Sequence, residues 1–176
     1  MSAANRAPAS AGSGKPLESY RDDARKLAPA DFEMRHGDAF LLLSAVQPRK
    51  PVDTSSTHLA LLGEEEGNTG ALATWVYPLR SAQHLITLGR SGESDVVIPD
   101  RSVSRRHALI KRSDDGRMQV LDAGSSNGTS VNGRNVLTRG AGPPSPLAPG
   151  DTLRLGSLEF TLAHAAALRE MAGKLR

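Results

Sequence analysis

Three stretches decide the fold of this chain: LGRSGESDVVIPDRSVSRRHALI at residues 88–110, LDAGSSNGTSVNGRNV at residues 121–136 and LAPGDTLRLG at residues 147–156. In each of them, short apolar runs alternate with turn residues such as Ser-Gly, Asn-Gly and Pro-Gly. Asn-Gly pairs between strand-like runs favour tight hairpins. Regular short strands separated by such turns predict a β-sandwich or a barrel.

The same alternation of short apolar runs and turn residues continues on both sides of these stretches. The strand-like runs, in chain order, are residues 75–79, 84–88, 95–98, 107–111, 118–122, 129–131, 135–137, 151–155 and 158–162. We therefore expect one all-β domain over residues 74–163. The Ala-, Leu- and Arg-rich residues 164–176 favour a short C-terminal helix.

The N-terminal half has a different character. Residues 1–17 are rich in Ala, Ser, Pro and Gly, so they offer little apolar surface to offset chain entropy and are expected to be disordered. Residues 18–73 are expected to form an extension with short helices and one or two strands. The apolar run at residues 40–46 is one strand candidate, with an ambiguous period, and residues 58–62 are another. The pattern leaves open whether residues 30–70 belong to the sandwich.

Composition excludes several classes of function. The 176 residues include no cysteine, which excludes disulfides and thiolate metal sites and is compatible with a reducing compartment. No apolar run approaches the ~20 residues of a transmembrane helix, and the N-terminus has no signal-peptide core. We expect a cytoplasmic protein that does not insert into membranes. A net charge of +3 with only 3% aromatic residues argues against nucleic acid as a partner. High Ala, with Arg preferred over Lys, suggests a bacterial source.

Three loop motifs carry the chemistry, and a strand-like run flanks each. They are Gly89-Arg90, Ser102 to His107, and Ser125 to Thr129 followed by Asn132-Gly133. A phosphate dianion needs a fixed cationic fork together with hydroxyl and amide donors that converge from loops. The three motifs together offer these groups: guanidinium groups at Arg90 and Arg105, hydroxyls at Ser104 and Ser126, and side-chain amides at Asn127 and Asn132.

The order and spacing of these motifs resemble the forkhead-associated (FHA) domain family over about residues 75–163. The resemblance implies an FHA-type β-sandwich of two antiparallel sheets, here with a partly ordered N-terminal extension and a short C-terminal helix. It also implies phosphothreonine-peptide binding, with a preference over phosphoserine, by an adaptor or regulator in Ser/Thr kinase signalling. The expected partner is then a phosphothreonine-containing protein, either a Ser/Thr kinase or its substrate.

The resemblance assigns roles to individual residues. It places Arg90 and Ser104 on the phosphate, Arg105 and Ser126 in supporting contacts, and Asn127 on the main chain of the bound peptide. Support of the peptide is expected from Ser102, Thr129 and Asn132. Structural roles, as bends, turns or loop contacts, are expected for Gly89, His107, Gly128 and Gly133. The Pro-rich loop at residues 140–149 is expected to alter the rim of the site.

Two other kinds of function remain open at this point. The sandwich could serve as an assembly adaptor whose binding does not depend on phosphorylation. Ser104 and His107, three residues apart, suggest a hydrolase with a serine nucleophile and a histidine base, but no acidic residue that would orient the histidine lies in a recognisable motif. The remaining histidines share no metal-ligand spacing. We therefore expect no enzyme activity, no metal and no cofactor.

Overall fold

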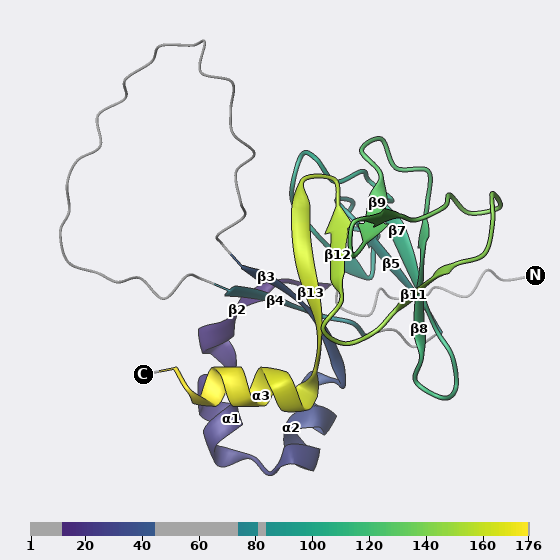
Figure 1. The fold of residues 1–176 in the computed structure, drawn as a ribbon. Coiled ribbons are helices and arrows are strands. Elements are labelled where there is room, and N and C mark those ends of the chain that lie inside the picture. The colour runs from purple at the N-terminus through teal and green to yellow at the C-terminus, as the bar shows by residue number, and fades with distance from the viewer. Residues whose placement is uncertain (1–11, 45–73, 81–83, 176) are drawn as a thin grey trace, which may run out of the picture.

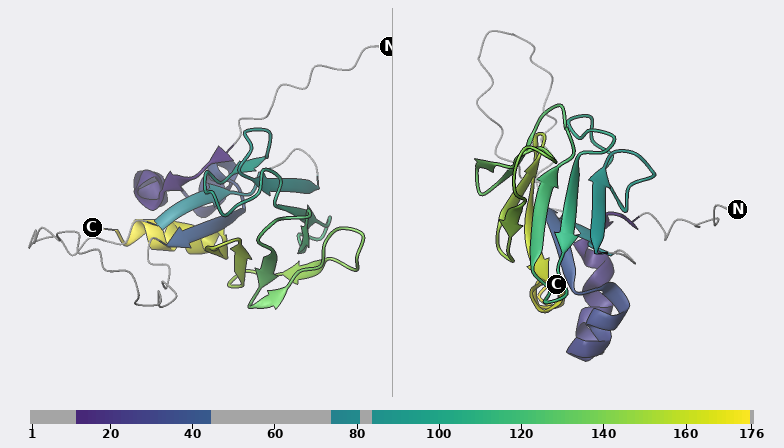
Figure 2. Two further views of the ribbon diagram at one scale, coloured as in Figure 1. Left: turned by 90° about the horizontal axis from the view of Figure 1, so that it is seen from above. Right: turned by 90° about the vertical axis from the view of Figure 1, so that its right-hand side faces the viewer.

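The computed structural model describes residues 12–44, 74–80 and 84–175 (Figure 1). Two β-sheets lie face to face, the helices gather at one end of the sandwich, and long loops project from the other end (Figure 2). The predicted β-sandwich with a short C-terminal helix is confirmed. The strand candidate at residues 58–62 lies outside the described residues.

The first sheet has the strand order β1-β6-β5-β7-β8-β11. Its strands are β1 (Gly12–Ser13), β5 (Leu85–Gly89), β6 (Val96–Val97), β7 (Ala108–Arg112), β8 (Met118–Asp122) and β11 (Ser145–Leu147). It is mixed, because β6 runs parallel to β5 and to β1. The Asp95 carboxylate accepts hydrogen bonds at 2.8 Å from both the backbone N–H and the hydroxyl of Thr87, which fixes the loop that brings β6 back beside β5.

The second sheet has the order β10-β9-β12-β13-β3-β4-β2 and is antiparallel throughout. Its strands are β2 (Lys15–Pro16), β3 (Ala39–Ser44), β4 (Thr74–Pro78), β9 (Thr129–Val131), β10 (Arg134–Asn135), β12 (Thr152–Leu155) and β13 (Leu158–His164). β3 lies between β13 and β4, so this strand from the N-terminal half is an interior strand of the sandwich.

The main core fills the space between the sheets. Side chains that alternate along each strand face inward, and the Tyr77 and Phe160 rings meet edge to face with centroids 5.7 Å apart. β3 is buried on both faces: Ala39 and Leu41 join this core, while Phe40 and Leu42 join a second cluster. Burial on both faces explains the continuous apolar run at the start of β3, whose period was ambiguous in the sequence.

The second cluster lies under a helical layer, which we call the helical cap. It consists of the 3₁₀ turn η1 (Leu17–Tyr20), α1 (Arg21–Lys26), α2 (Pro29–His36) and α3 (Ala165–Gly173), and it covers the outer face of β3 and β4 (Figure 1). Pro29 in the first turn and Gly37, with φ 101°, just after the last residue are favourable ends for α2. Arg25 and Arg169 donate to carbonyls across the cap, which ties the N-terminal helices to the C-terminal one.

Two expected boundaries need correction. The disordered tail was expected to reach residue 17, but β1 and β2 pair with β6 and β4, and the Leu17 side chain is buried. The all-β domain was expected to begin at residue 74, with the place of residues 30–70 left open, and the pairing of β3 shows that the sandwich includes Ala39–Ser44. In both cases the pairings join residues far apart in the chain, and local composition carries no information about them. Residues 1–11 and 45–73 of the expected tail and extension lie outside the described residues.

The described residues contain neither a membrane-spanning helix nor a cluster of metal-ligating side chains. No helix within the described ranges is long and apolar enough to cross a membrane. In the same ranges, no three or more His, Asp or Glu side chains are grouped so that they could hold a metal ion.

Candidate functional site

A hollow of about 670 Å³ lies among loops of the sandwich. The loops project from the end away from the helical cap (Figure 1). The hollow is built by the loop after β5, the loop before β7 and the loop between β8 and β9. The residues that line it are Arg90, Ser91, Glu93, Arg101, Ser102, Val103, Ser104, Arg105, Arg106, Gly124, Ser126 and Asn127. All five residues expected at the phosphate and the peptide main chain are among them, as is Ser102.

Arg90 extends from the end of β5 into this hollow. Its backbone N–H donates to the Ser104 carbonyl at 3.0 Å and its Nε to the Val103 carbonyl at 3.2 Å, which fixes the direction of the guanidinium. The two terminal nitrogens have no hydrogen bond to any other described residue. The preceding residue must be glycine, because a Cβ on Gly89 would lie 2.2 Å from the carbonyl oxygen of Arg105.

Ser104 and Ser126 meet across the hollow. The Ser104 hydroxyl oxygen accepts the backbone N–H of Ser126 at 3.0 Å. This contact joins the loop before β7 to the loop after β8, and the hydroxyl proton of Ser104 remains available to donate to a bound group. Arg105 follows Ser104 directly in the chain, and its side chain is exposed. The backbone carbonyl of Arg105 accepts the N–H of Ser91 at 3.1 Å.

Asn127 and Ser102 form another part of the rim. The Asn127 side-chain amide donates to the Ser102 carbonyl at 2.8 Å, which leaves its oxygen and one N–H to meet a ligand. The Ser102 hydroxyl is 2.6 Å from the Asp100 carboxylate and 2.8 Å from the Ser157 hydroxyl. Ser102 therefore holds the loop in place with its hydroxyl while its surface lines the hollow.

His107 lies under the hollow, fully buried. Its Nδ1 accepts the Ser104 backbone N–H at 2.9 Å, and its Nε2 donates to the Gly128 carbonyl at 3.1 Å, so the ring is the neutral tautomer with the proton on Nε2. Burial lowers the pKa of His107, although the Gly128 carbonyl and the Asp122 carboxylate oppose this. Its bond to Ser104 is to the backbone and not to the hydroxyl, so the pair is not arranged as a nucleophile and its base.

We predict that acid weakens the fold through His107. Because the pKa of this imidazole is lower in the folded chain than the roughly 6.5 of the unfolded one, the unfolded chain takes up the proton first. The contribution of His107 is therefore complete above about pH 6.5 and is lost as the pH falls below it, by at most about 1.4 kcal/mol per pH unit. Urea unfolding between about pH 7.5 and pH 5.5 measures this, with His107→Gln as the non-titrating control. An identical pH dependence in both proteins would contradict the prediction.

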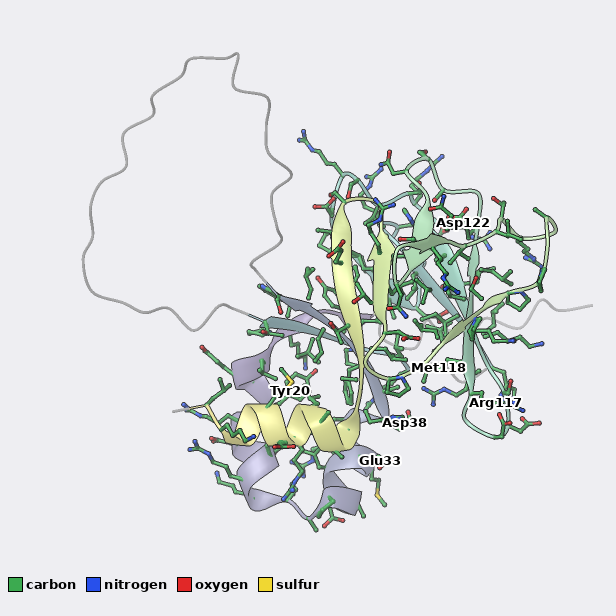
Figure 3. The ribbon with its side chains drawn as sticks, in the orientation of Figure 1. Tyr20, Glu33, Asp38, Arg117, Met118 and Asp122 are labelled. Atoms are coloured by element: carbon green, nitrogen blue, oxygen red, sulfur yellow. The ribbon has the colours of Figure 1, made fainter. Side chains whose placement is uncertain are left out.

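Asp122 is the anchor of the loop between β8 and β9 and lies near the same end of the sandwich (Figure 3). Its buried carboxylate accepts the N–H groups of Gly124 and Ser125, each at 2.8 Å, and the hydroxyls of Ser125 and Thr129 at 2.6 and 2.7 Å. Burial alone would raise the pKa of Asp122, but these hydrogen bonds outweigh it and hold the pKa below its ordinary value. The sequence reasoning missed this residue, although an Asp two positions before a Gly is typical of such a turn.

Two of the residues expected to support a peptide do not reach the hollow. Thr129 is buried, and its hydroxyl is committed to Asp122. The Asn132 amide donates to Asp151 at 2.8 Å and accepts the Thr152 N–H at 2.9 Å, in a turn where Asn132 itself has φ 49°. Asn132 therefore fixes the neighbouring hairpin. Gly128 and Gly133 have φ of 77° and 76°, which fits their expected roles in turns.

Four further charged or polar side chains line the hollow that the sequence reasoning did not include: Ser91, Glu93, Arg101 and Arg106. Single arginines and serines in loops are too common to be singled out in a sequence. The one available signal was the clustering of arginines, since Arg101, Arg105 and Arg106 all lie within the expected loop.

Fold and site together define a class of protein: a β-sandwich that serves as scaffold for a cationic, donor-rich binding site at its loop tips. The family model of the FHA domain matches residues 86–156. An oxoglutarate dehydrogenase inhibitor of Corynebacterium glutamicum is 36% identical over 107 residues, which covers 48% of this chain and 74% of that protein. The chain belongs to the FHA domain family.

Other relatives are matched over shorter shares of their length. The oxoglutarate dehydrogenase inhibitor of Corynebacterium diphtheriae is 43% identical over 74 residues, or 42% of this chain and 47% of that protein. The chain spans about half the length of several such curated relatives. A solved structure from a study of phosphothreonine-dependent FHA domain interactions is 26% identical, covers 72% of this chain and 95% of that one, and has a TM-score of 0.46.

Proposed function

We propose that this chain is a phosphothreonine-peptide-binding module that acts as an adaptor or regulator in Ser/Thr kinase signalling. One observation carries the proposal: Arg90, Ser104 and Asn127, from three separate loops, line one hollow and retain donor groups that the fold does not use. A phosphate dianion presents oxygens that accept several charge-assisted hydrogen bonds at once. A neutral peptide offers no group that would use the guanidinium in this way.

In the proposed complex, Arg90 and Ser104 bind the phosphate, and Arg105 and Ser126 add supporting contacts. Asn127 binds the main chain of the peptide, for which its free amide groups are suited, and Ser102 forms part of the rim. The bond from the Ser126 N–H to the Ser104 hydroxyl supports this assignment, because it directs the hydroxyl proton away from Ser126. Thr129 and Asn132 have no part in the proposed contacts.

The names of the relatives are consistent with regulation. They include an oxoglutarate dehydrogenase inhibitor and a glycogen accumulation regulator. We propose that the partner is a phosphothreonine-containing Ser/Thr kinase or a substrate of one, that the chain binds without catalysing a reaction, and that it acts in the cytoplasm. The His107 contacts support the absence of catalysis, because within the part of the chain that the structure describes no hydrogen bond from a base activates the Ser104 hydroxyl.

The test begins with an oriented phosphothreonine peptide library screened against the purified chain. The best sequence is then titrated by calorimetry in three forms, with phosphothreonine, phosphoserine and threonine. We expect the threonine form to bind at least about 100-fold more weakly, because several charge-assisted hydrogen bonds of about 1.5–3 kcal/mol each are lost. The phosphoserine form is expected to fall between the two.

Equal binding of the phosphothreonine and threonine forms would contradict the proposal. It would favour the alternative of an assembly adaptor that does not depend on phosphorylation. Treatment of a captured partner with phosphatase gives the same distinction for a whole protein, since binding that survives the treatment needs no phosphate.

A further inference from the structure

The hollow carries more positive charge than one phosphate group needs. Four guanidinium groups line it, from Arg90, Arg101, Arg105 and Arg106, against one carboxylate, Glu93. A phosphothreonine brings a charge of about −1.5 to −2 and three acceptor oxygens. The proposed phosphate contacts from Arg90, Arg105 and two serine hydroxyls already match that group. Glu93 can offset at most one of the two remaining guanidinium groups, so Arg101 and Arg106 together keep an excess of positive charge when the phosphate is bound.

Neither of these two arginines is used by the fold. Both side chains are exposed, and neither makes an ion pair or hydrogen bond to any residue that the structure describes. Three arginines elsewhere in the chain do form ion pairs: Arg35, Arg112 and Arg117 lie 3.1, 2.7 and 2.6 Å from aspartate carboxylates. Cations that line a binding site and form no ion pair with a described residue favour a ligand that supplies acidic groups.

In the chain, Arg101 precedes Ser104 and Arg106 follows it. Arg101 adjoins Ser102, whose backbone and hydroxyl contact Asn127 and Ser157. Arg106 adjoins Arg105, whose carbonyl accepts from Ser91 and from the Ser94 hydroxyl. The contacts beside Arg101 join its loop to Asn127 and to Ser157, which lies between β12 and β13 of the second sheet. The contacts beside Arg106 join its loop to the loop after β5. A peptide whose phosphothreonine sits at Ser104 would extend past one arginine in each direction.

We infer that the preferred ligand of this site is a phosphothreonine peptide with acidic side chains on both flanks, those on one flank facing Arg101 and those on the other facing Arg106. The inference rests on the proposed function and adds the sequence class of the ligand. Exposed ion pairs are weak one at a time, so each acidic flank is expected to strengthen binding by about 2- to 5-fold. The advantage should shrink as salt is raised, because exposed charges are screened.

The experiment titrates five peptides into the purified chain by calorimetry at low salt. Four contain phosphothreonine, with alanine flanks, with acidic residues on the N-terminal side only, on the C-terminal side only, or on both sides. The fifth has both acidic flanks and unphosphorylated threonine. The same series is repeated with Arg101→Ala, with Arg106→Ala and with Arg139→Ala, an exposed arginine outside the hollow that serves as the matched control.

We expect the doubly acidic phosphopeptide to bind the unmodified chain about 4- to 25-fold more tightly than the alanine-flanked one. Arg101→Ala should abolish the advantage of one flank, Arg106→Ala that of the other, and Arg139→Ala neither. Equal affinity for alanine-flanked and acidic phosphopeptides would overturn the inference and leave the proposed function intact. Equal binding of the unphosphorylated acidic peptide, or no binding of any phosphopeptide, would overturn both.

Discussion

Replacing Arg90 with alanine is expected to weaken the binding of a phosphothreonine peptide by about 10- to 100-fold while the sandwich stays folded. The guanidinium is held over the hollow by the bond from its Nε to the Val103 carbonyl, and its terminal nitrogens are left for the phosphate. Each charge-assisted hydrogen bond to a phosphate oxygen is worth roughly 1.5–3 kcal/mol. A calorimetric titration of the variant and the unmodified chain with the same phosphopeptide measures the loss.

Two further variants sharpen this test. Arg90→Lys keeps the charge but not the planar fork, so its affinity should lie between those of the alanine variant and the unmodified chain. Arg139→Ala removes an exposed arginine that does not line the hollow and should bind normally. A thermal melt of each variant shows whether the fold is retained. If Arg90→Ala binds the phosphopeptide as tightly as the unmodified chain, the assignment of the site is wrong.

Replacing Phe40 with alanine is expected to destabilise the whole sandwich by about 3–5 kcal/mol, a large share of the roughly 5–15 kcal/mol typical of a domain. The ring is fully buried in β3 under the helical cap, with its centroid 6.3 Å from that of Tyr20. Alanine would leave a cavity between the second sheet and the cap. Unfolding in urea, followed by circular dichroism, measures the change in the free energy of unfolding.

The matched control for Phe40 is another apolar residue of the N-terminal extension. Met34 in α2 is 84% exposed, so Met34→Ala should change the free energy of unfolding by no more than about 0.5 kcal/mol. If Phe40→Ala unfolds at the same urea concentration as the unmodified chain, the extension is not an integral part of the sandwich. In that case the β-domain would be stable without its N-terminal strand.

The strands of the second half of the chain could be predicted because their turns are local. The Asn-Gly and Pro-Gly pairs between residues 127 and 150 mark turns by the backbone angles that glycine permits. Of these pairs, Asn132-Gly133 closes a hairpin, between β9 and β10, whereas the strands beside Asn127-Gly128 and Pro149-Gly150 belong to different sheets. The position of β3 could not be predicted in this way. Its apolar run was visible, but its partners β13 and β4 are fixed by pairing between distant residues and by the burial of both its faces.

Proline-rich segments misled the sequence interpretation in another way. Residues 140–149 were expected to shape the rim of the site, but Ser145–Leu147 form β11, which pairs with β8 at the edge of the first sheet. None of these residues lines the hollow. Proline has no backbone N–H to donate, and it is tolerated in an edge strand because the backbone groups on one side of that strand have no partner strand. The two-residue strand at Lys15–Pro16 is a similar case at the opposite edge of the fold.

Of the site, the loops were predictable but the directions of single side chains were not. Arg90, Ser104 and Asn127 all line the hollow, as their motifs suggested. Thr129 lies two residues beyond Asn127 in the same motif, yet its side chain points inward to Asp122. Whether a hydroxyl faces a ligand or a buried carboxylate depends on the exact residue at which β9 begins, and the sequence does not give this.

The most direct test of the central claim is an NMR titration of the isotope-labelled chain with a phosphothreonine peptide. We expect the largest shifts at the backbone amides of Arg90, Ser104, Arg105, Ser126 and Asn127, with the helical cap unchanged. The threonine form of the same peptide should shift none of them. Shifts that instead concentrate on the helical cap, or that appear equally with the unphosphorylated peptide, would contradict the account.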